Sequence, residues 1–133
     1  MLKVQNNLYV KWTEEKGYGV FSDKPIKKGE LVETCYCIKT GSPKNQASDE
    51  LMDYVFNYPQ KVNIGEGAVH VLPLGFGCIY NHDDNSNVEW HDNPNIPYHF
   101  DFVALRDINA HDEICSYYGK DYWPQKKQRN EEK

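Results

Sequence analysis

GFGCIYNHDDNSN is the sequence of residues 75–87, and DEICSYYGKDYW is the sequence of residues 112–123. The first stretch places the pair Asn81-His82 directly after a short apolar run. The second stretch ends another apolar run in a tyrosine-rich turn that Gly119 closes. Neither motif is specific alone, because Asn and His are both common in loops. Their occurrence together and in this order indicates one functional site built from both stretches, if the fold brings them together.

The composition indicates a single globular domain with an acidic surface. The chain has 133 residues, which is long enough to bury a core without disulfides or metals. Its net charge of −5 argues against direct nucleic-acid binding, which needs a basic face, and favours a basic partner such as a lysine-rich peptide. Residues 125–133 are charged and contain no apolar side chain, so we expect a disordered tail there.

The cysteines predict reduced thiols in the core of an intracellular protein. Cys35, Cys37, Cys78 and Cys115 are irregularly spaced and lie mostly within apolar runs. No second cluster supplies the remaining ligands of a zinc site around the first two. The N-terminal residues lack an apolar stretch long enough for a signal peptide, and no segment is suited to span a membrane.

Short alternating segments and frequent turns predict a mainly β domain. Ser48 is a candidate N-cap for a short helix that runs through Phe56 and stops before Pro59. Residues 26–31 (IKKGEL) faintly resemble residues 108–113 (INAHDE), and both segments are interpreted as turns that lead into a strand. Strands or β-leaning segments are expected at residues 8–13, 30–38, 62–74, 88–90, 98–105 and 114–118, and residues 16–21 (KGYGVF) are interpreted as a tight glycine turn followed by β formers.

Two other kinds of site are weighed against these motifs. A carboxylate–imidazole metal site could use a cluster of acidic and histidine residues, although none of its pairs has helical spacing. A Ser-His-Asp or Cys-His mechanism is compatible with the composition, but no nucleophile-elbow sequence is present. The cluster comprises His82, Asp83, Asp84, His91, Asp92, His99 and Asp101.

The assembled motifs resemble the SET-domain family of protein-lysine methyltransferases over residues 2–124. The likeness is greatest to the compact stand-alone SET proteins of viruses and bacteria. In chain order the matching motifs are Gly17-Tyr18-Gly19-Val20-Phe21, Ile26 with Gly29-Glu30-Leu31, Tyr54, Gly75-Phe76 with Asn81-His82 and Asn87, and Asp112-Glu113-Ile114 with Tyr118-Gly119. The resemblance implies a β-clip fold of several small curled sheets, with one or two short helices and a knot-like C-terminal threading.

The resemblance also implies a cofactor, S-adenosyl-L-methionine, and no metal. The backbone from Gly17 through Tyr18 to Gly19 would lie along the methionine part of that cofactor. The Asn81 side chain would bind its amine, the His82 backbone would bind its adenine, and Trp123 would stack on the adenine.

In the family, a tyrosine-lined channel holds the lysine to be methylated. By resemblance, Tyr118 is the catalytic tyrosine and also contacts the cofactor, while Tyr54 and Tyr122 line the channel. Tyr117 neighbours Tyr118 on an expected strand and would point the other way, so we assign it to packing. Methyl transfer from a sulfonium needs chiefly alignment of a neutral amine with the methyl carbon, and an aromatic channel lowers the pKa of that amine by desolvation.

The expected function is therefore S-adenosylmethionine-dependent methylation of the ε-amine of a lysine in a basic protein, a histone or another. The alternative is a catalytically inactive SET-like module that binds a lysine-rich peptide. The resemblance implies an intracellular location, in the cytoplasm or in the host nucleus if the source is viral. Because some stand-alone members dimerise, a homodimer is an assembly open to this chain.

The sequence departs from the family pattern at three positions near the motifs. Asp83 replaces the serine that usually follows Asn-His, and Ser86 stands where a proline often precedes Asn87. His111 stands where the family tends to have Gly, in a turn expected to need a positive φ, which His tolerates better than most residues. None of these changes removes a group that is expected to contact the cofactor.

Overall fold

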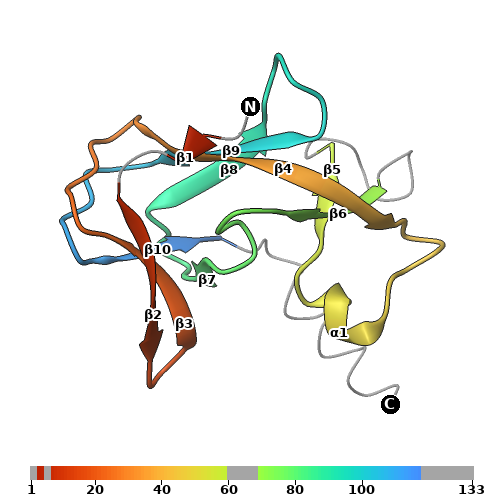
Figure 1. The fold of residues 1–133 in the computed structure, drawn as a ribbon, viewed down its shortest axis with the longest axis horizontal. Helices are drawn as coiled ribbons and strands as arrows, with labels where there is room; N and C mark the ends of the chain where they lie inside the picture. The colour runs from red at the N-terminus through yellow and green to blue at the C-terminus, as the bar shows by residue number, and fades with distance from the viewer. Residues whose placement is uncertain (1–2, 5–6, 60–68, 118–133) are drawn as a thin grey trace.

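The computed structural model describes residues 3–4, 7–59 and 69–117, in which the chain forms ten strands and one helical turn (Figure 1). Frequent turn-forming residues keep most strands short, and the longest strand, with 11 residues, crosses the molecule. The elements are β1 (Lys3–Val4), β2 (Leu8–Thr13), β3 (Gly17–Ser22), β4 (Leu31–Gly41), α1 (Asp49–Met52), β5 (Phe56–Tyr58), β6 (Val69–Pro73), β7 (Asn81–His82), β8 (Val88–Asp92), β9 (His99–Ala104) and β10 (Glu113–Ser116).

The larger sheet is built around β4 and is antiparallel throughout. Its strands follow the order β5-β6-β4-β9-β8, and β1 also pairs with β4. Buried and half-buried residues alternate along β9, so one face of this strand, with Phe100, Phe102 and Ala104, points into the core. The strand predicted at residues 98–105 is therefore confirmed. Its alternating apolar and polar residues correspond to one buried face and one half-buried face of the sheet.

The smaller sheet brings together segments that are far apart in sequence. Its strands follow the order β2-β3-β10-β7. β10 pairs antiparallel with β3 and parallel with β7, and the parallel pairing sets Cys115 opposite Asn81 and Ser116 opposite His82. β7, from the stretch 75–87, and β10, from the stretch 112–123, therefore lie side by side, and β3 lies on the other side of β10.

The two similar turn segments meet and share a positive φ at equivalent positions. Ile26 and Ile108 form an antiparallel bridge, in which each N–H donates to the other's carbonyl at 2.9 and 2.7 Å. Gly29 and His111 occupy equivalent positions in their turns, and both have positive φ, 86° and 68°. The expectation that the turn at His111 needs a positive φ is confirmed.

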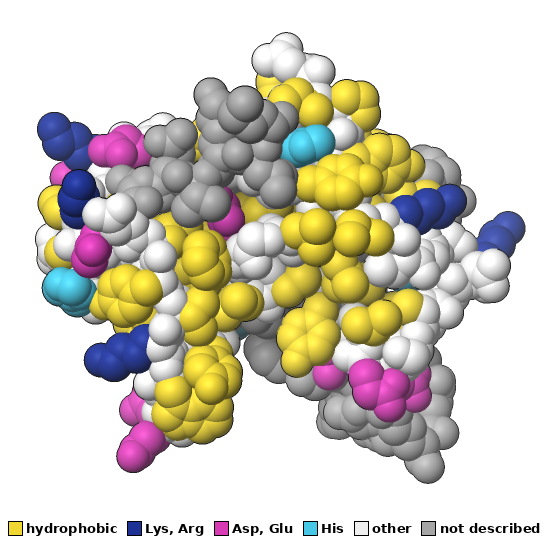
Figure 2. All heavy atoms as spheres, viewed as in Figure 1, with side chains coloured by type: hydrophobic (Ala, Val, Ile, Leu, Met, Phe, Trp, Pro, Cys, Tyr) yellow, Lys and Arg dark blue, Asp and Glu magenta, His cyan; other side chains and the backbone are white. Residues whose placement is uncertain are grey.

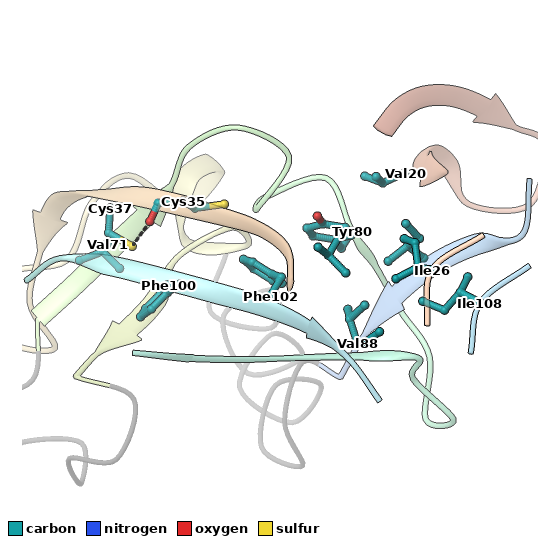
Figure 3. Close-up of a cluster of buried hydrophobic side chains, with 13 residues drawn as sticks. Val20, Ile26, Cys35, Cys37, Val71, Tyr80, Val88, Phe100, Phe102 and Ile108 are labelled. Carbon is teal, nitrogen blue, oxygen red and sulfur yellow. Dashed lines mark hydrogen bonds between the residues drawn. The ribbon is translucent and has the colours of Figure 1, made fainter. Parts of the chain in front are cut away.

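One hydrophobic core extends across both sheets. Tyr80, Phe100 and Phe102 are fully buried, and the rings of Tyr80 and Phe102 stack with centroids 4.8 Å apart. Figure 3 shows Tyr80 between Phe102 and the aliphatic side chains that the smaller sheet and the two turns contribute, such as Val20 and Ile26. Packing against common neighbours fixes how the sheets meet.

The predicted helix is shorter than expected, and its second half was assigned wrongly. The helical turn covers only Asp49–Met52, and the N-cap residue Ser48 makes no side-chain capping hydrogen bond. Phe56–Tyr58 instead forms β5, which pairs with β6. The Phe56 ring contacts the Trp90 ring, with centroids 4.9 Å apart, so burial in the core overrides the local helical pattern.

The fold class and the state of the cysteines agree with the sequence analysis, while three predicted features fall outside the described residues. The prediction of a mainly β domain of small curled sheets is confirmed, and all four cysteines are free thiols, of which Cys78 alone is not fully buried. No helix within the described ranges is long and apolar enough to cross a membrane. The knot-like C-terminal threading, the tail at residues 125–133 and the first half of the β-leaning segment 62–74 lie outside the described residues.

Candidate active site

The start of β3 forms one wall of the site, and its two glycines serve different purposes. Gly17 has a φ of 76°, a conformation that L side chains rarely adopt, and its carbonyl accepts a hydrogen bond from Thr13 Oγ1 at 2.8 Å. Gly19 is needed for space instead, because a Cβ there would lie 2.5 Å from Glu113 Oε2 and 3.2 Å from Asn81 Nδ2. The missing side chain of Gly19 lets these two polar groups approach the backbone.

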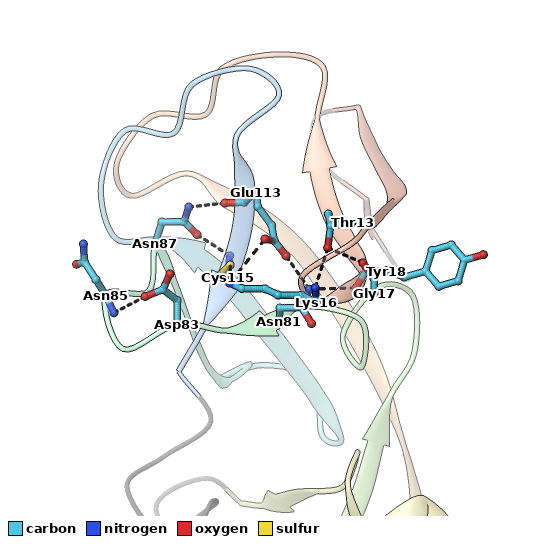
Figure 4. A network of polar contacts seen from close by, with 10 residues as sticks. All are labelled: Thr13, Lys16, Gly17, Tyr18, Asn81, Asp83, Asn85, Asn87, Glu113 and Cys115. Carbon is cyan, nitrogen blue, oxygen red and sulfur yellow. Dashed lines mark hydrogen bonds and ion pairs between the residues drawn. The ribbon is translucent and has the colours of Figure 1, made fainter.

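The Asn81 side chain lies against this wall and has a defined orientation (Figure 4). Its Nδ2 donates to Tyr18 O at 3.0 Å and to Glu113 Oε2 at 2.7 Å. Because both partners can only accept, they require the amide nitrogen on this side. Oδ1 is then the remaining hydrogen-bonding atom of the amide, and within the described residues it has no partner, which suits it to bind a donor such as an amine.

An ion pair adjoins this amide. Lys16 Nζ lies 3.8 Å from Glu113 Oε1, and the side chains are 35% and 20% exposed, respectively. The Lys16 ammonium also lies 3.9 Å from Cys115 Sγ. Burial, followed by the nearby Glu113 carboxylate, raises the pKa of the Cys115 thiol to about 11, so this thiol is protonated and unreactive at neutral pH. The sequence motif included Glu113, but neither Glu113 nor Lys16 was predicted as a site residue.

Asn87 holds the two halves of the site together. Its Nδ2 donates to Glu113 O at 2.9 Å, and its Oδ1 accepts from the N–H of Cys115 at 2.8 Å. The side chain therefore replaces the next strand of the sheet for this part of β10. The family motif contained Asn87 without a role, and its burial and its four hydrogen-bonding groups become apparent only in the fold.

The loop after Asn81 is held by side chains, including the unusual Asp83. Asp83 Oδ1 accepts from the N–H of Asn85 at 2.8 Å, a local turn that a serine can also make, so this departure from the family pattern preserves the turn. The guanidinium of Arg106 donates to Ser86 O at 2.6 Å and to Asn85 O at 3.1 Å. Sequence reasoning did not single out Arg106, because its contacts depend on the pairing of β8 with β9, which sets Arg106 beside the loop before β8.

His82 lies beside the site with its imidazole engaged in other contacts. Its Nε2 is 2.7 Å from Asp84 Oδ1, and the Tyr117 ring lies 5.3 Å from the imidazole between ring centroids. The adenine contact predicted for the His82 backbone stays a prediction. Tyr117 packs against His82 while remaining 44% exposed, in keeping with the packing role expected for it.

The predicted channel tyrosines are only partly described. Tyr54 follows α1 and is 52% exposed, and its carbonyl is 3.7 Å from the thiol of Cys78, in the loop that leads to β7. This contact ties the Tyr54 segment to the chain just before Asn81. Tyr118, Tyr122 and Trp123 lie outside the described residues, so their predicted roles stay predictions.

The alternative of a metal site finds no assembled ligand cluster in the part of the chain that the structure describes. Within those residues no group of three or more His, Cys, Asp or Glu side chains is arranged to hold a metal. His99 is engaged with Pro97 O at 2.9 Å, and Asp101 accepts from Thr34 and Asn93. The contacts with Pro97 and Asn93 lie in the β8–β9 hairpin and its turn, and the contact with Thr34 joins β9 to β4.

Comparisons with known proteins converge on one family. The profile of the SET domain matches residues 17–119. A Schizosaccharomyces pombe histone-lysine N-methyltransferase, specific for lysine 37 of histone H3, is 32% identical over 124 residues, which cover 90% of this chain and 78% of the relative.

Solved structures agree with this match. A candidate histone methyltransferase of Plasmodium falciparum superposes with a TM-score of 0.70 at 28% identity, over 90% of this chain and 99% of that one. A Neurospora SET-domain histone lysine methyltransferase shares the fold, with a TM-score of 0.68 at 15% identity, over 88% of this chain and 54% of that one. The expected β-clip architecture is thereby confirmed.

Proposed function

Since the chain belongs to the SET-domain family and is a protein-lysine methyltransferase, we propose that it transfers a methyl group from S-adenosyl-L-methionine to the ε-amine of a lysine in a basic protein. The observation that carries this proposal is the position of Asn81 between the β3 backbone and β10, with Nδ2 bound and Oδ1 facing no partner among the described residues. An amide oxygen held in this way suits the α-amine of the cofactor.

The donor and acceptor groups of the described residues fit such a cofactor. At the start of β3, Gly17 is half-buried, Tyr18 is exposed and Gly19 is buried, and Asn81 and Glu113 present oxygen atoms beside this backbone. S-adenosylmethionine, when bound, supplies a methyl group on a positively charged sulfur. Oxygen acceptors near that end suit its positive charges and require no metal.

The chain's own contribution to the reaction is positioning and dehydration. We assign to Tyr118 the orientation of the lysine amine, with Tyr54 and Tyr122 as walls of the channel. Aromatic walls exclude water and disfavour the charged ammonium, so the amine reaches the methyl carbon in its neutral, nucleophilic form. The lysine ammonium first loses its proton to solvent, and the carbon–nitrogen bond then forms as the bond between the methyl carbon and the sulfur breaks, which leaves S-adenosylhomocysteine.

The surface near the predicted channel suits a basic peptide. Several exposed apolar side chains belong to β4 and to the segments around α1, among them Tyr36, Ile38 and Leu51. Figure 2 shows hydrophobic side chains gathered over β4, with acidic side chains gathered near α1, where Asp49 and Glu50 occupy the first turn. Apolar contacts flanked by negative charge favour a peptide that carries lysine or arginine.

These features support a protein substrate within the cell, either cytoplasmic or nuclear. The relatives reported above are named as methyltransferases, and no observation favours the catalytically inactive binding module. The substrate of the fission-yeast relative, a histone, makes core histones the first candidates to test.

The test is transfer of isotope-labelled methyl groups from the cofactor to purified histones, with the modified residue identified by mass spectrometry. We expect label on lysine, and we expect Tyr118→Phe to reduce kcat at least about tenfold, because positioned hydroxyl groups contribute at this scale. Tyr117→Phe removes a hydroxyl from the neighbouring residue and is the matched control. Full activity in Tyr118→Phe would contradict the role of that hydroxyl, and absence of cofactor binding would overturn the function.

A further inference from the structure

Glu33 carries a buried carboxyl group that the roles assigned so far do not use. It lies on β4, in the larger sheet, and is only 1% exposed. The register of the sheet shifts between Leu31 and Glu33, and Glu33 pairs with Phe102, so its side chain lies on the core face of the sheet. Burial of a carboxyl costs free energy, and an apolar side chain of similar size often fills such a space at a lower cost. Stability alone therefore does not account for this residue.

Both oxygen atoms of this carboxyl bind the loop that connects β6 to β7. Oε1 accepts from the hydroxyl of Tyr80 at 2.6 Å, and Oε2 accepts from the N–H of Phe76 at 3.3 Å. The loop passes so close to the carboxyl that a Cβ at Gly75 would lie 2.8 Å from Oε2. Glu33 therefore holds the loop near its beginning and at its end.

The end of this loop leads directly into the candidate active site. Tyr80 is fully buried, and its ring stacks on the Phe102 ring, which belongs to the larger sheet. The next residue, Asn81, begins β7, a strand of two residues that pairs with β10 at the end of the smaller sheet. So short a strand has few backbone hydrogen bonds to fix it, and its position therefore depends on the residues on either side of it.

We propose that Glu33 is a positioning residue for the active site, which acts through the Tyr80 hydroxyl and fixes the Asn81 amide beside β3. At 2.6 Å the hydrogen bond between Glu33 and Tyr80 is short for two oxygen atoms, so it restrains the far end of the Tyr80 side chain. Asn81 then keeps Nδ2 on Tyr18 O at 3.0 Å and presents Oδ1 to the cofactor. The inference rests on the proposed function and extends it from a residue that touches the cofactor to the one that holds it in place.

The experiment is a double-mutant cycle between Tyr80 and Asn81. Calorimetry measures the affinity of the full chain for S-adenosylhomocysteine, which keeps the amino-acid end of the cofactor but has no methyl group to transfer. The variants are Tyr80→Phe, which removes only the hydroxyl, Asn81→Ala, and the two combined. Tyr58→Phe is the matched control, because it removes a hydroxyl that accepts from the N–H of Tyr98 at 2.9 Å.

Two variants of Glu33 complete the design. Glu33→Leu fills the same space without an acceptor, and Glu33→Gln keeps an amide oxygen that can accept from Tyr80. Glu33→Leu and Tyr80→Phe should each weaken binding of S-adenosylhomocysteine about tenfold, and Glu33→Gln no more than about twofold. A tenfold loss in Glu33→Gln as well would show that an acceptor for the hydroxyl is not sufficient, which contradicts the inference.

The cycle separates positioning from a general loss of stability. Because the hydroxyl acts through Asn81, Tyr80→Phe should cause no further loss of affinity once Asn81→Ala is present. Tyr58→Phe should lower the free energy of unfolding and leave the affinity unchanged. If the losses add in the double variant, or if Tyr58→Phe weakens binding as much as Tyr80→Phe does, the inference is wrong.

Hydrogen exchange in the ligand-free chain tests the inference independently of the proposed function. The N–H of Asp83, just after β7, donates to Ser116 O at 3.1 Å, and the N–H of Ile108 donates to Ile26 O at 2.7 Å. Tyr80→Phe should speed exchange at Asp83 at least about threefold relative to exchange at Ile108. If the wild type does not bind S-adenosylhomocysteine, the proposed function is overturned, and the faster exchange still supports the positioning of β7. Unchanged relative exchange contradicts the inference whether or not the ligand binds.

Discussion

At the scale of single residues, the two glycines of β3 predict different consequences for the same substitution. Gly17→Ala forces a side chain into a φ of 76°, so we expect a loss of about 1 kcal/mol in the free energy of unfolding. Gly19→Ala places a Cβ 2.5 Å from Glu113 Oε2, which is the end of a flexible side chain and can move. We therefore expect little change in stability but about tenfold weaker binding of S-adenosylhomocysteine, because the contact between Glu113 and Asn81 is lost.

Urea unfolding and calorimetry on both variants check this pair of expectations. A loss of stability in Gly19→Ala larger than that in Gly17→Ala would show that Glu113 cannot move aside. Unchanged ligand affinity in Gly19→Ala would show that the carboxylate does not contribute to binding.

The buried carboxyl of Glu33 predicts a pH dependence of stability. Burial raises its pKa above the ordinary value of 4.5, although the hydroxyl of Tyr80 donates to it at 2.6 Å and opposes the shift. As the pH rises above about 4.5, the unfolded chain releases this proton before the folded chain does, so the wild type loses stability with rising pH through this group. Glu33→Gln is neutral at every pH and lacks this loss.

The difference in unfolding free energy, variant minus wild type, should therefore increase between about pH 4 and pH 7. Its absolute value at low pH also contains the cost of placing an amide beside the N–H of Phe76, so the slope is the decisive quantity. Glu89→Gln, which removes an exposed carboxyl, supplies the baseline for urea unfolding across the same range. A difference that stays flat or decreases would contradict a raised pKa.

Sequence patterns identified candidate site residues where the residue type itself is distinctive, such as a glycine or an asparagine within a motif. Asn81, Gly17 and Gly19 belong to a motif and lie together in the structure, and the positive φ at His111 was expected from the family's glycine. Lys16 and Glu113 could not be recognised in this way, because charged residues are common on any surface. Their proximity follows from the pairing of β3 with β10, which no local pattern contains.

At the scale of elements, the molecule contains two strand–turn–strand units that pair with each other. The first unit joins β3 to β4, and the second joins β9 to β10. The first strand of each unit pairs with the second strand of the other, since β3 pairs with β10 and β9 pairs with β4. The turns of the two units meet at the bridge between Ile26 and Ile108. Equivalent hydrogen bonds close both turns, from Gly29 N to Ala104 O and from His111 N to Ser22 O, each at 2.8 Å.

This symmetry makes Gly29 a test of the turn. No atom lies within 4 Å of a Cβ placed there, so the cost of Gly29→Ala comes from the φ of 86° alone. We expect a loss of about 1 kcal/mol, and a smaller loss in Gly29→Asn, because Asn tolerates this region as His111 does in the second turn. Equal losses in the two variants, measured by urea unfolding, would show that the side chain rather than the backbone is responsible.

Elements were predicted correctly where the pattern was long and local. β9 has strong alternation, and the limits of both β2 and β9 match the expectation closely. The helix after Ser48 was overextended because Val55 and Phe56 fit a helical spacing equally well. The aromatic cluster of Phe56 with Trp90 and Phe100 decides the outcome, and that cluster exists only once three distant strands have paired.

At the scale of the whole molecule, the site depends on contacts between its two sheets. β7 and β10 are separated by two other strands along the chain, β8 and β9, yet they pair in parallel, with β10 next to β3. The sequence contained both segments and their order but not this pairing, since parallel neighbours leave no signal in either strand alone. The likeness to a known family supplied the information that pattern and composition lacked.

Asn87 is the residue through which this organisation can be tested. Its backbone accepts from the N–H of Leu105 at 2.8 Å, beside the larger sheet, and donates to Cys115 O at 3.1 Å, in the smaller one. Its side chain bonds the N–H of Cys115 and the carbonyl of Glu113. Removing this side chain leaves polar groups of β10 without partners at a buried position, and such groups cost about 1 to 3 kcal/mol each.

We therefore expect Asn87→Ala to lower the free energy of unfolding by about 2 to 3 kcal/mol and to weaken S-adenosylhomocysteine binding, because β10 carries Glu113 into the site. Asn95→Ala removes an amide of the same size from an exposed turn and should change neither quantity. If Asn87→Ala has the same free energy of unfolding as the wild type, water replaces the lost hydrogen bonds and the contact between the two sheets at Asn87 is not rigid. If stability falls while binding stays unchanged, the position of Glu113 is set by its contacts with β3 rather than by the hydrogen bonds of Asn87.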